Sequence, residues 1–324
     1  MERQHNLDIL KCISAFLVIC IHVGFIDYGI IIKSLSRIAV PIFLLISGYF
    51  YPLKKQGNKH VKFFWKIVKL TIFSNLFYLF VDIFIFHTGA AYNKNALIRL
   101  IFFNAGIPGI GVHLWYFNAL ICTMLFVIIC DRYIRKMFFL IPVLLIFSYI
   151  ISSLTTNLLF YRNFLFMALP FFLLGYYIRD NEEKLSNLCK KIIGTSRNVI
   201  LLFVLEAIML GLEIIIYKKF GLPIYREIYF MTIPMVLTLF LGALYVFPDK
   251  TIKYVCTIGE KYSAYIYIFH IFIMHTIQVI LYKYTQVDFS KMYYINVIII
   301  FVLTIAFVHV YLNMKKYISL IMKK

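Results

Sequence analysis

"LDILKCISAFLVICIHVGFI", residues 7–26, is a run of mostly apolar residues near the start of the chain. An α-helix rises about 1.5 Å per residue, so a run of about 20 residues spans the hydrocarbon core of a bilayer. The run nevertheless carries two ionisable residues, Lys11 and His22, which are costly to place in lipid. We therefore expect a membrane-spanning helix whose polar side chains face the interior of the protein.

The rest of the chain has the same apolar character. Of its 324 residues, 63% are hydrophobic and only 15% are charged, and the mean hydropathy is +0.88. A soluble domain cannot bury that much apolar surface. The pattern predicts an all-α fold, a polytopic integral membrane helix bundle that forms a single domain over residues 1–324. About ten transmembrane helices are expected, near residues 7–26, 35–52, 63–86, 113–130, 137–152, 163–178, 198–217, 228–247, 262–282 and 293–312.

Lys and Arg residues are distributed unevenly between the connections. With the N-terminus inside the cell, the inner segments hold 23 of the 33 Lys and Arg residues and the outer segments hold 10. These residues collect on the cytoplasmic side of membrane helices. We therefore expect both termini in the cytoplasm, in a multi-pass protein whose partners include membrane lipids. The same bias explains the formal net charge of +19 without a nucleic-acid partner.

Lys11 and His22 are spaced so that a helix brings them to one face. Eleven residues at about 100° each leave them about 20° apart around the helix and about 16 Å apart along it. Lys11 would lie near the cytoplasmic end and His22 near the outer end. Two interpretations remain open. Ionisable groups inside spans are usually functional, but Lys11 could also extend to the interface and a neutral His22 could bond a neighbouring carbonyl.

Three further stretches place polar residues at predicted outer ends of spans. Arg37 occurs in "SRIAVPIFLLISGYFYP", and its guanidinium suits an oxyanion, a carboxylate or a phosphate, or else anchors the helix at the interface. "GVHLWYFNAL" brings His113 and Trp115 to the fourth span, where an aromatic ring can stack on a sugar; the alternative is an interfacial aromatic belt. "YRNFLFMALPFFLLGYYI" places Arg162 and Asn163 at another outer entry.

Two ionisable residues fall well inside later spans. His270 lies near the middle of the ninth span, in "YSAYIYIFHIFIMH", where it needs a partner or a cavity. Glu206 lies in the seventh span and could bind a polar ligand or a proton. The histidines are otherwise scattered without metal-ligand spacing, so we expect no metal. Together the polar residues predict a cavity that opens outward and connects to the cytoplasm, lined by Lys11, His22, Arg37, His113, Arg162, Glu206 and His270.

Several of these stretches resemble the acyltransferase type 3 family of ten-span integral membrane acyltransferases. The family's first span carries a basic residue, ten further residues and a histidine. Lys11 and His22 match this signature, with Lys where many members have Arg. "SRIAVPIFLLISGYF", "HLWYF" and "YIYIFH" resemble later landmarks, so the resemblance covers essentially the whole chain. "RNFLFMALPFFLLGYYI" and "REIYFMTIPMV" also resemble the membrane domain of vancomycin-resistance serine racemases. Because no racemase or hydrolase domain is visible, we expect a standalone acyltransferase core.

The resemblance implies an enzyme of the bacterial plasma membrane that modifies the cell envelope. Members move an acyl group, usually acetyl, from cytoplasmic acyl-CoA to a hydroxyl of an extracytoplasmic polysaccharide or lipid-linked sugar. By motif, His22 is the catalytic histidine and Lys11 its basic partner.

The chemistry agrees with these roles, because a histidine can take the proton of a sugar hydroxyl as it attacks a thioester. Arg37 is our candidate donor to the oxyanion, and Lys11 our candidate to bind the CoA. An acyl-histidine intermediate remains open. Glycan-assembly proteins are further candidate partners. The predicted substrate-binding residues are His113, Trp115, Arg162, Asn163, Glu206 and His270.

Two other functions are compatible with the sequence. A transporter that exports a polysaccharide or imports a small solute such as serine would explain Pro41, Pro170 and Pro234, since prolines can interrupt helices at a substrate site. However, no inverted repeat with matching interruptions accompanies them, and the alignment of Lys11 with His22 favours chemistry. A scaffold within a glycan-assembly complex would not require ionisable groups inside the membrane.

Overall fold

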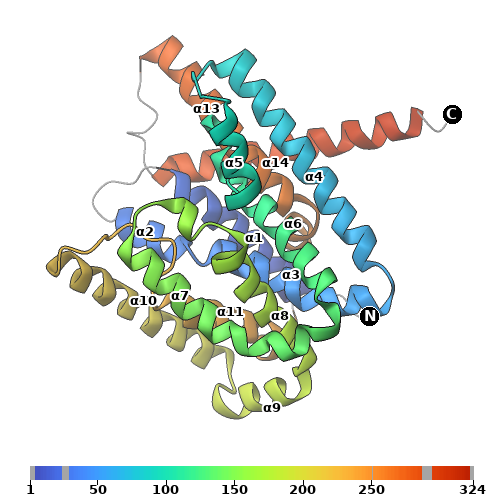
Figure 1. Cartoon of the computed structure of the whole chain (residues 1–324), viewed down its shortest axis with the longest axis vertical. Helices are drawn as coiled ribbons and strands as arrows, with labels where there is room; N and C mark the ends of the chain where they lie inside the picture. The colour runs from blue at the N-terminus through green and yellow to red at the C-terminus, as the bar shows by residue number, and fades with distance from the viewer. Residues whose placement is uncertain (1–3, 24–28, 250, 287–293, 322–324) are drawn as a thin grey trace. The chain divides into compact units, whose positions relative to one another are not determined.

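The structure is a computed structural model that describes residues 4–23, 29–249, 251–286 and 294–321 (Figure 1). Within these ranges every regular element is a helix and no strand occurs. In the described part of the chain, eight helical stretches are long and apolar enough to cross a membrane. The predicted all-α, polytopic membrane bundle is therefore confirmed.

The helices follow the ten predicted segments, but two of them are short. The sixth segment corresponds to the π-helix η5 (Phe164–Ala168) followed by α8 (Leu169–Asp180), and the eighth corresponds to α11 (Thr232–Tyr245). The end of the first predicted segment, at 24–26, and the start of the tenth, at 293, lie outside the described residues. The eight longer stretches are His5–His22, Gly29–Gln56, His60–Phe86, Gly109–Ile129, Asp131–Leu154, Ser196–Lys219, Lys253–Thr285 and Asn296–Ile321.

The chain divides into two compact units, which we describe separately. Residues 1–39 and 247–324 form what we call the terminal unit, and residues 40–246 form the central unit. The sequence predicts a single domain over the whole chain, and this stays a prediction.

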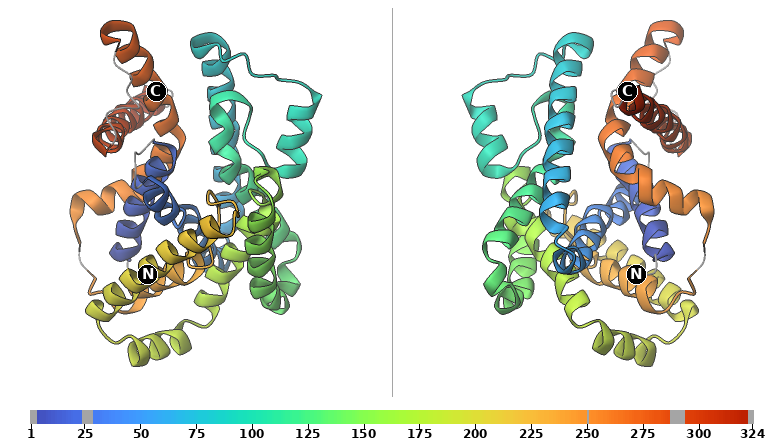
Figure 2. Two further views of the ribbon diagram at one scale, coloured as in Figure 1. Left: turned by 90° about the vertical axis from the view of Figure 1, so that its left-hand side faces the viewer. Right: turned by 90° about the vertical axis from the view of Figure 1, so that its right-hand side faces the viewer.

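The terminal unit is built around α1 (His5–His22). One side of α1 is buried along its whole length, from Leu7 through Ala15 to Ile19. α13 and α14 also pack against each other, as Figures 1 and 2 show in orange and red. The elements that pack against α1 are α2 (Gly29–Ser36), α12 (Lys253–Thr257), the π-helix η6 (Ile258–Tyr262), α13 (Ser263–Thr285) and α14 (Tyr294–Ile321).

The backbones of α1 and η6 meet at Gly259. A Cβ atom at this position would overlap the carbonyl group of Asp8, so only glycine allows the two helices to come this close. Nearby, Asn6 Nδ2 donates to the Phe247 carbonyl at 3.1 Å. These contacts hold the half of α1 that carries Lys11 against the helical stretch that continues to His270.

Substitution of Gly259 by alanine should therefore lower the melting temperature of the protein in detergent micelles. The added methyl group has to displace backbone, and overpacking of this kind costs about 1–3 kcal/mol. Gly211→Ala is the matched control, because nothing lies within 4 Å of a Cβ atom at Gly211 and alanine stabilises a helix interior relative to glycine. Equal melting temperatures for the two variants would contradict the close contact.

The central unit contains the remaining helices. α3 and α8 cross with their backbones in contact, because Gly48 lies against the Phe172 carbonyl and Gly175 against the Leu45 carbonyl. Small residues at a crossing let membrane helices pack closely. In chain order the elements are α3 (Ala39–Gln56), α4 (His60–Val81), η1 (Asp82–Phe86), α5 (Lys94–Phe103), η2 (Gly109–Leu114), α6 (Trp115–Ile129), η3 (Asp131–Phe139), α7 (Leu140–Leu154), η4 (Leu158–Phe160), η5 (Phe164–Ala168), α8, α9 (Glu182–Ile192), α10 (Ser196–Lys219) and α11.

Candidate functional site

The candidate site in the terminal unit centres on two histidines from different helices. His22 is the last residue of α1, and His270 lies one third of the way along α13. Their ring centroids are 5.2 Å apart and the ring planes are tilted by 49°. His270 is only 1% exposed, whereas His22 is partly exposed. The structure thus pairs the predicted catalytic histidine with a residue that the sequence predicted only as substrate-binding.

Hydrogen bonds within α13 fix the orientation and tautomer of the His270 ring. Its Nδ1 atom lies 3.1 Å from the Ile266 carbonyl oxygen and 2.9 Å from that of Tyr267. Because a carbonyl oxygen only accepts, we assign the proton to Nδ1. In the neutral ring, Nε2 is then the acceptor. A π-helical turn, η6, directly precedes α13, and such turns are frequent at functional sites.

Lys11 lies on α1 with a carboxylate partner that the sequence analysis missed. Its Nζ atom is 3.0 Å from Asp8 Oδ1, and the side chains are 21% and 7% exposed, respectively. The signal was present in the sequence, since residues three apart on a helix are neighbours. α1 is continuous from His5 to His22, so Lys11 and His22 keep the shared face that their spacing predicts.

Arg37, the predicted oxyanion donor, lies in the turn between α2 and α3. Its backbone N–H donates to the Ser34 carbonyl at 3.2 Å, which closes the turn after α2. Since α2 packs against α1, Arg37 belongs to the same unit as His22. Its predicted role stays a prediction.

The central unit holds a second polar cluster, around Arg162. The guanidinium Nε donates to Glu227 Oε1 at 2.7 Å, and Nη2 contacts the same oxygen. The two side chains are only 15% and 5% exposed. The guanidinium carbon also lies 5.9 Å from the ring centroid of Trp115. The structure therefore brings together Arg162 and Trp115, two predicted substrate-binding residues, and adds Glu227, which sequence reasoning missed.

His113 lies near the start of α6 in a packed aromatic environment. It is 4% exposed, its Nδ1 lies 3.2 Å from the Ile110 carbonyl oxygen, and its ring meets Tyr78 edge to face at 4.7 Å. These contacts favour a structural role for His113 in the turn before α6, and substrate contact stays a prediction.

Asn163 and Glu206, also predicted to bind substrate, have local partners. Asn163 Oδ1 accepts from the backbone N–H groups of Leu165 and Phe166, each at 3.0 Å, which caps the helical segment that begins at η5. Glu206 is 7% exposed and accepts from Thr238 Oγ1 at 2.7 Å, which joins α10 to α11. These contacts favour structural roles for both residues, while ligand binding by either remains a prediction.

Comparison with known proteins places this architecture in a family. The family model described as "Acyltransferase domain" matches residues 4–312, nearly the whole chain. A "Serine/alanine racemase" of Enterococcus gallinarum is 25% identical over 347 residues, which cover 97% of this chain and 46% of that protein. An "Amino-acid racemase" of Enterococcus faecalis is 24% identical over 266 residues, which cover 74% of this chain and 35% of that protein.

The chain therefore spans about half the length, or less, of these relatives. No solved structure matches it. Because the family model covers both the terminal and the central unit, the chain belongs to the acyltransferase type 3 family of integral membrane proteins.

Proposed function

We propose that this protein is a multi-pass O-acyltransferase of the bacterial plasma membrane, with both termini in the cytoplasm. It would move an acyl group, with acetyl as the first candidate, from cytoplasmic acyl-CoA to a hydroxyl of an extracytoplasmic polysaccharide or lipid-linked sugar. The observation that carries the proposal is the contact of His22 with His270 at 5.2 Å. This contact places a partly exposed histidine, which can act as a base, beside a buried histidine ring of fixed orientation. The chain that holds them belongs to an acyltransferase family.

In this proposal His22 acts as the general base. It takes the proton from the sugar hydroxyl as the hydroxyl oxygen attacks the thioester carbonyl carbon, which forms the new C–O bond. The tetrahedral oxyanion then collapses, the C–S bond breaks, and His22 returns the proton to the departing thiolate. General base catalysis of this kind contributes about 10²–10⁴-fold. Arg37 would stabilise the oxyanion with its fixed positive charge.

His270 would serve as a positioning residue for His22. The hydrogen bonds from Nδ1 to the helix carbonyls and the near-complete burial of His270 hold its ring in one orientation beside His22. The pair therefore combines one ring that can gain a proton with one that holds its place.

The ion pair of Lys11 with Asp8 changes how Lys11 can act. A lysine already paired at 3.0 Å would bind the anionic end of CoA only by exchanging Asp8 for it. In this proposal Lys11 would leave its ion pair with Asp8 and bind the anionic donor when the donor arrives from the cytoplasm.

Reconstitution into liposomes tests the proposed function against transport. We expect purified protein to cleave acetyl-CoA, measured as free thiol, at a rate that depends on an added sugar acceptor. The acetyl ester should appear on that acceptor by mass spectrometry. Movement of a sugar or of serine across the bilayer without acetyl-CoA, and without thiol release, would instead identify a transporter.

A further inference from the structure

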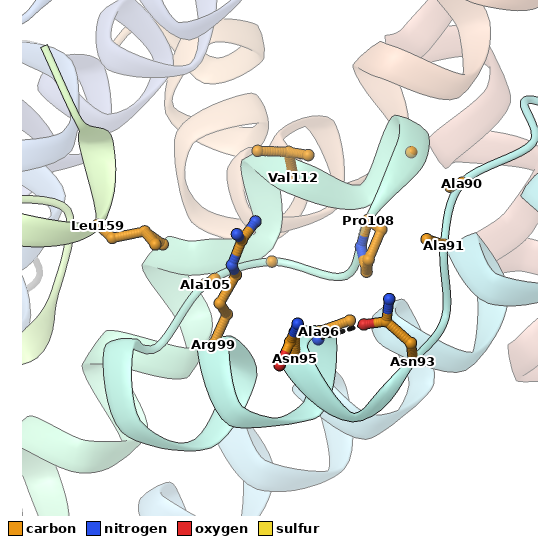
Figure 3. Close-up of a pocket in the computed structure, with 12 residues that line it drawn as sticks. Ala90, Ala91, Asn93, Asn95, Ala96, Arg99, Ala105, Pro108, Val112 and Leu159 are labelled. Carbon is orange, nitrogen blue, oxygen red and sulfur yellow. Dashed lines mark hydrogen bonds between the residues drawn. The ribbon is translucent and has the colours of Figure 1, made fainter.

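The central unit contains a cavity of about 440 Å³ in the connection between α4 and α6. Figure 2 shows α5 standing to one side of α4 and α6, joined to them by two connections. The cavity lies among these elements, and its volume falls within the range of small-molecule sites, about 300–1,000 Å³. Its principal lining residues are Ala90, Asn93, Asn95, Arg99, Pro108 and Val112 (Figure 3).

One wall of the cavity is held in place by the buried carboxylate of Asp82. This residue is 1% exposed. It accepts a hydrogen bond from Thr88 Oγ1 at 2.7 Å and another from the Tyr92 hydroxyl. Burial and the bond to Asp82 raise the pKa of Tyr92, so its phenol stays protonated and donates. Gly109, in the left-handed region at φ +72°, lies against the same carboxylate, where a Cβ atom would overlap it.

The opposite side of the cavity is fixed by asparagines. Asn93 caps α5 by accepting from the Ala96 N–H at 3.1 Å, the bond drawn in Figure 3. Asn118 Nδ2 donates to the Ala105 carbonyl at 2.6 Å, and Asn104 Oδ1 accepts from the Phe164 N–H at 3.0 Å. The cavity therefore has walls that are set by polar contacts within the chain, which are part-buried except for the exposed Asn93 bond, and that are formed before any ligand arrives.

The side chains offered to the cavity are hydrogen-bond donors and a positive charge. Arg99 extends from α5 toward Val112 in Figure 3, with Asn95 beside it one turn earlier on the same helix. Within the described residues, the Arg99 guanidinium forms no ion pair. The sequence contains no Asp or Glu between Asp82 and Asp131. Arg99 is an exposed residue, so its guanidinium is available at the cavity to bind a carboxylate or a phosphate through two donors.

We propose that this cavity binds an anionic sugar unit of the acceptor glycan. Arg99 would contact the carboxylate or phosphate of that unit, and Asn95 its hydroxyl groups. The identification rests on the proposed function, in which residues 87–112 face the outside of the cell and the acceptor is a glycan. It narrows the acceptor to a glycan that contains a uronic acid or a sugar phosphate.

The test is a binding titration of the full chain in nanodiscs of uncharged phosphatidylcholine. The probes are a disaccharide that contains glucuronic acid, glucose 1-phosphate, and the same disaccharide with its carboxylate reduced to the alcohol. We expect at least one anionic probe to bind and the neutral one to bind about tenfold more weakly or worse, as loss of a charge-assisted bond predicts. The Arg99→Gln variant should bind the anionic probe more weakly than the unchanged protein by a similar factor.

Lys94→Gln is the matched control, because Lys94 is a neighbouring cation on α5 that does not line the cavity. We expect the Lys94→Gln variant to bind the anionic probe with the same affinity as the unchanged protein. Equal affinity of Arg99→Gln and the unchanged protein would overturn the proposal, as would equal binding of neutral and anionic disaccharides. If the protein binds phosphatidylglycerol supplied in the nanodisc and none of the sugars, the cavity holds a lipid headgroup, and the proposal that it binds a glycan is wrong.

The two proposals fail separately. If acceptor-dependent cleavage of acetyl-CoA is observed but no anionic probe binds, only the cavity assignment is wrong. If Arg99-dependent binding is observed but no thioester is cleaved under any condition, the cavity binds an anionic sugar, but the acyltransferase proposal is wrong and that sugar is not its acceptor. The variant His22→Ala should keep the affinity for the anionic probe, because His22 is not part of the cavity.

Discussion

Replacement of His22 by alanine should lower acyl transfer to the sugar acceptor by about 10²–10⁴-fold, the contribution of a positioned general base. The residue lies at the end of α1 and is partly exposed, so its truncation leaves the buried face of the helix intact. We therefore expect the variant to reach the membrane in normal amounts and to melt near the temperature of the unchanged protein. The measurement is the initial rate of ester formation on the acceptor in proteoliposomes.

Replacement of a second histidine serves as the control for His22→Ala. His309 on α14 is exposed, lies 2.8 Å from the Tyr262 hydroxyl and has no part in the proposed chemistry, so His309→Ala should leave the rate unchanged. His270→Gln should give an intermediate loss and should shift the pH dependence of the rate, because a positioning residue acts through the base. Full activity in His22→Ala would exclude His22 as the base and with it the proposed mechanism.

The sequence predicts what depends on local periodicity. The apolar runs predict the helices, and the eleven-residue spacing predicts that Lys11 and His22 share a face of α1, since both properties follow from helix geometry. The pairing of Asp8 with Lys11 could also have been predicted from the sequence, because the two residues lie one helical turn apart. Hydropathy also predicts the segments at 163–178 and 228–247, but it does not predict that the first begins as the π-helix η5 or that the helix of the second begins only at Thr232.

Pairings between distant segments could not be predicted in the same way. Nothing in the spacing of residues indicates that His22 meets His270, or that Arg162 meets Glu227, which is 65 residues away. Both depend on which helices pack together and at what rotation, and a single sequence does not encode this as a pattern. The cavity beside Arg99 was missed because its walls are set by asparagines and glycines in a connection without periodicity.

Replacement of Glu227 by alanine should produce the largest loss of stability among the changes considered. The carboxylate is the partner of Arg162 in a pair whose side chains are 15% and 5% exposed. Removing one member of a buried pair leaves the other charge uncompensated, at a cost of about 3–5 kcal/mol. We expect the melting temperature in detergent micelles to fall by about 6 °C or more.

Two further variants separate this electrostatic effect from general damage. Arg135→Ala breaks another arginine–carboxylate pair, with Asp180 at 2.8 Å, but the Arg135 side chain is 74% exposed, so its loss should cost about 1 kcal/mol at most. The double variant Arg162→Met with Glu227→Leu removes both charges at once and should be more stable than Glu227→Ala alone, because no buried charge is left without its partner. If Glu227→Ala melts no lower than Arg135→Ala, the buried pair does not stabilise the central unit. If the double variant is stable but fails to bind the acceptor, Arg162 acts on substrate, as the sequence predicts.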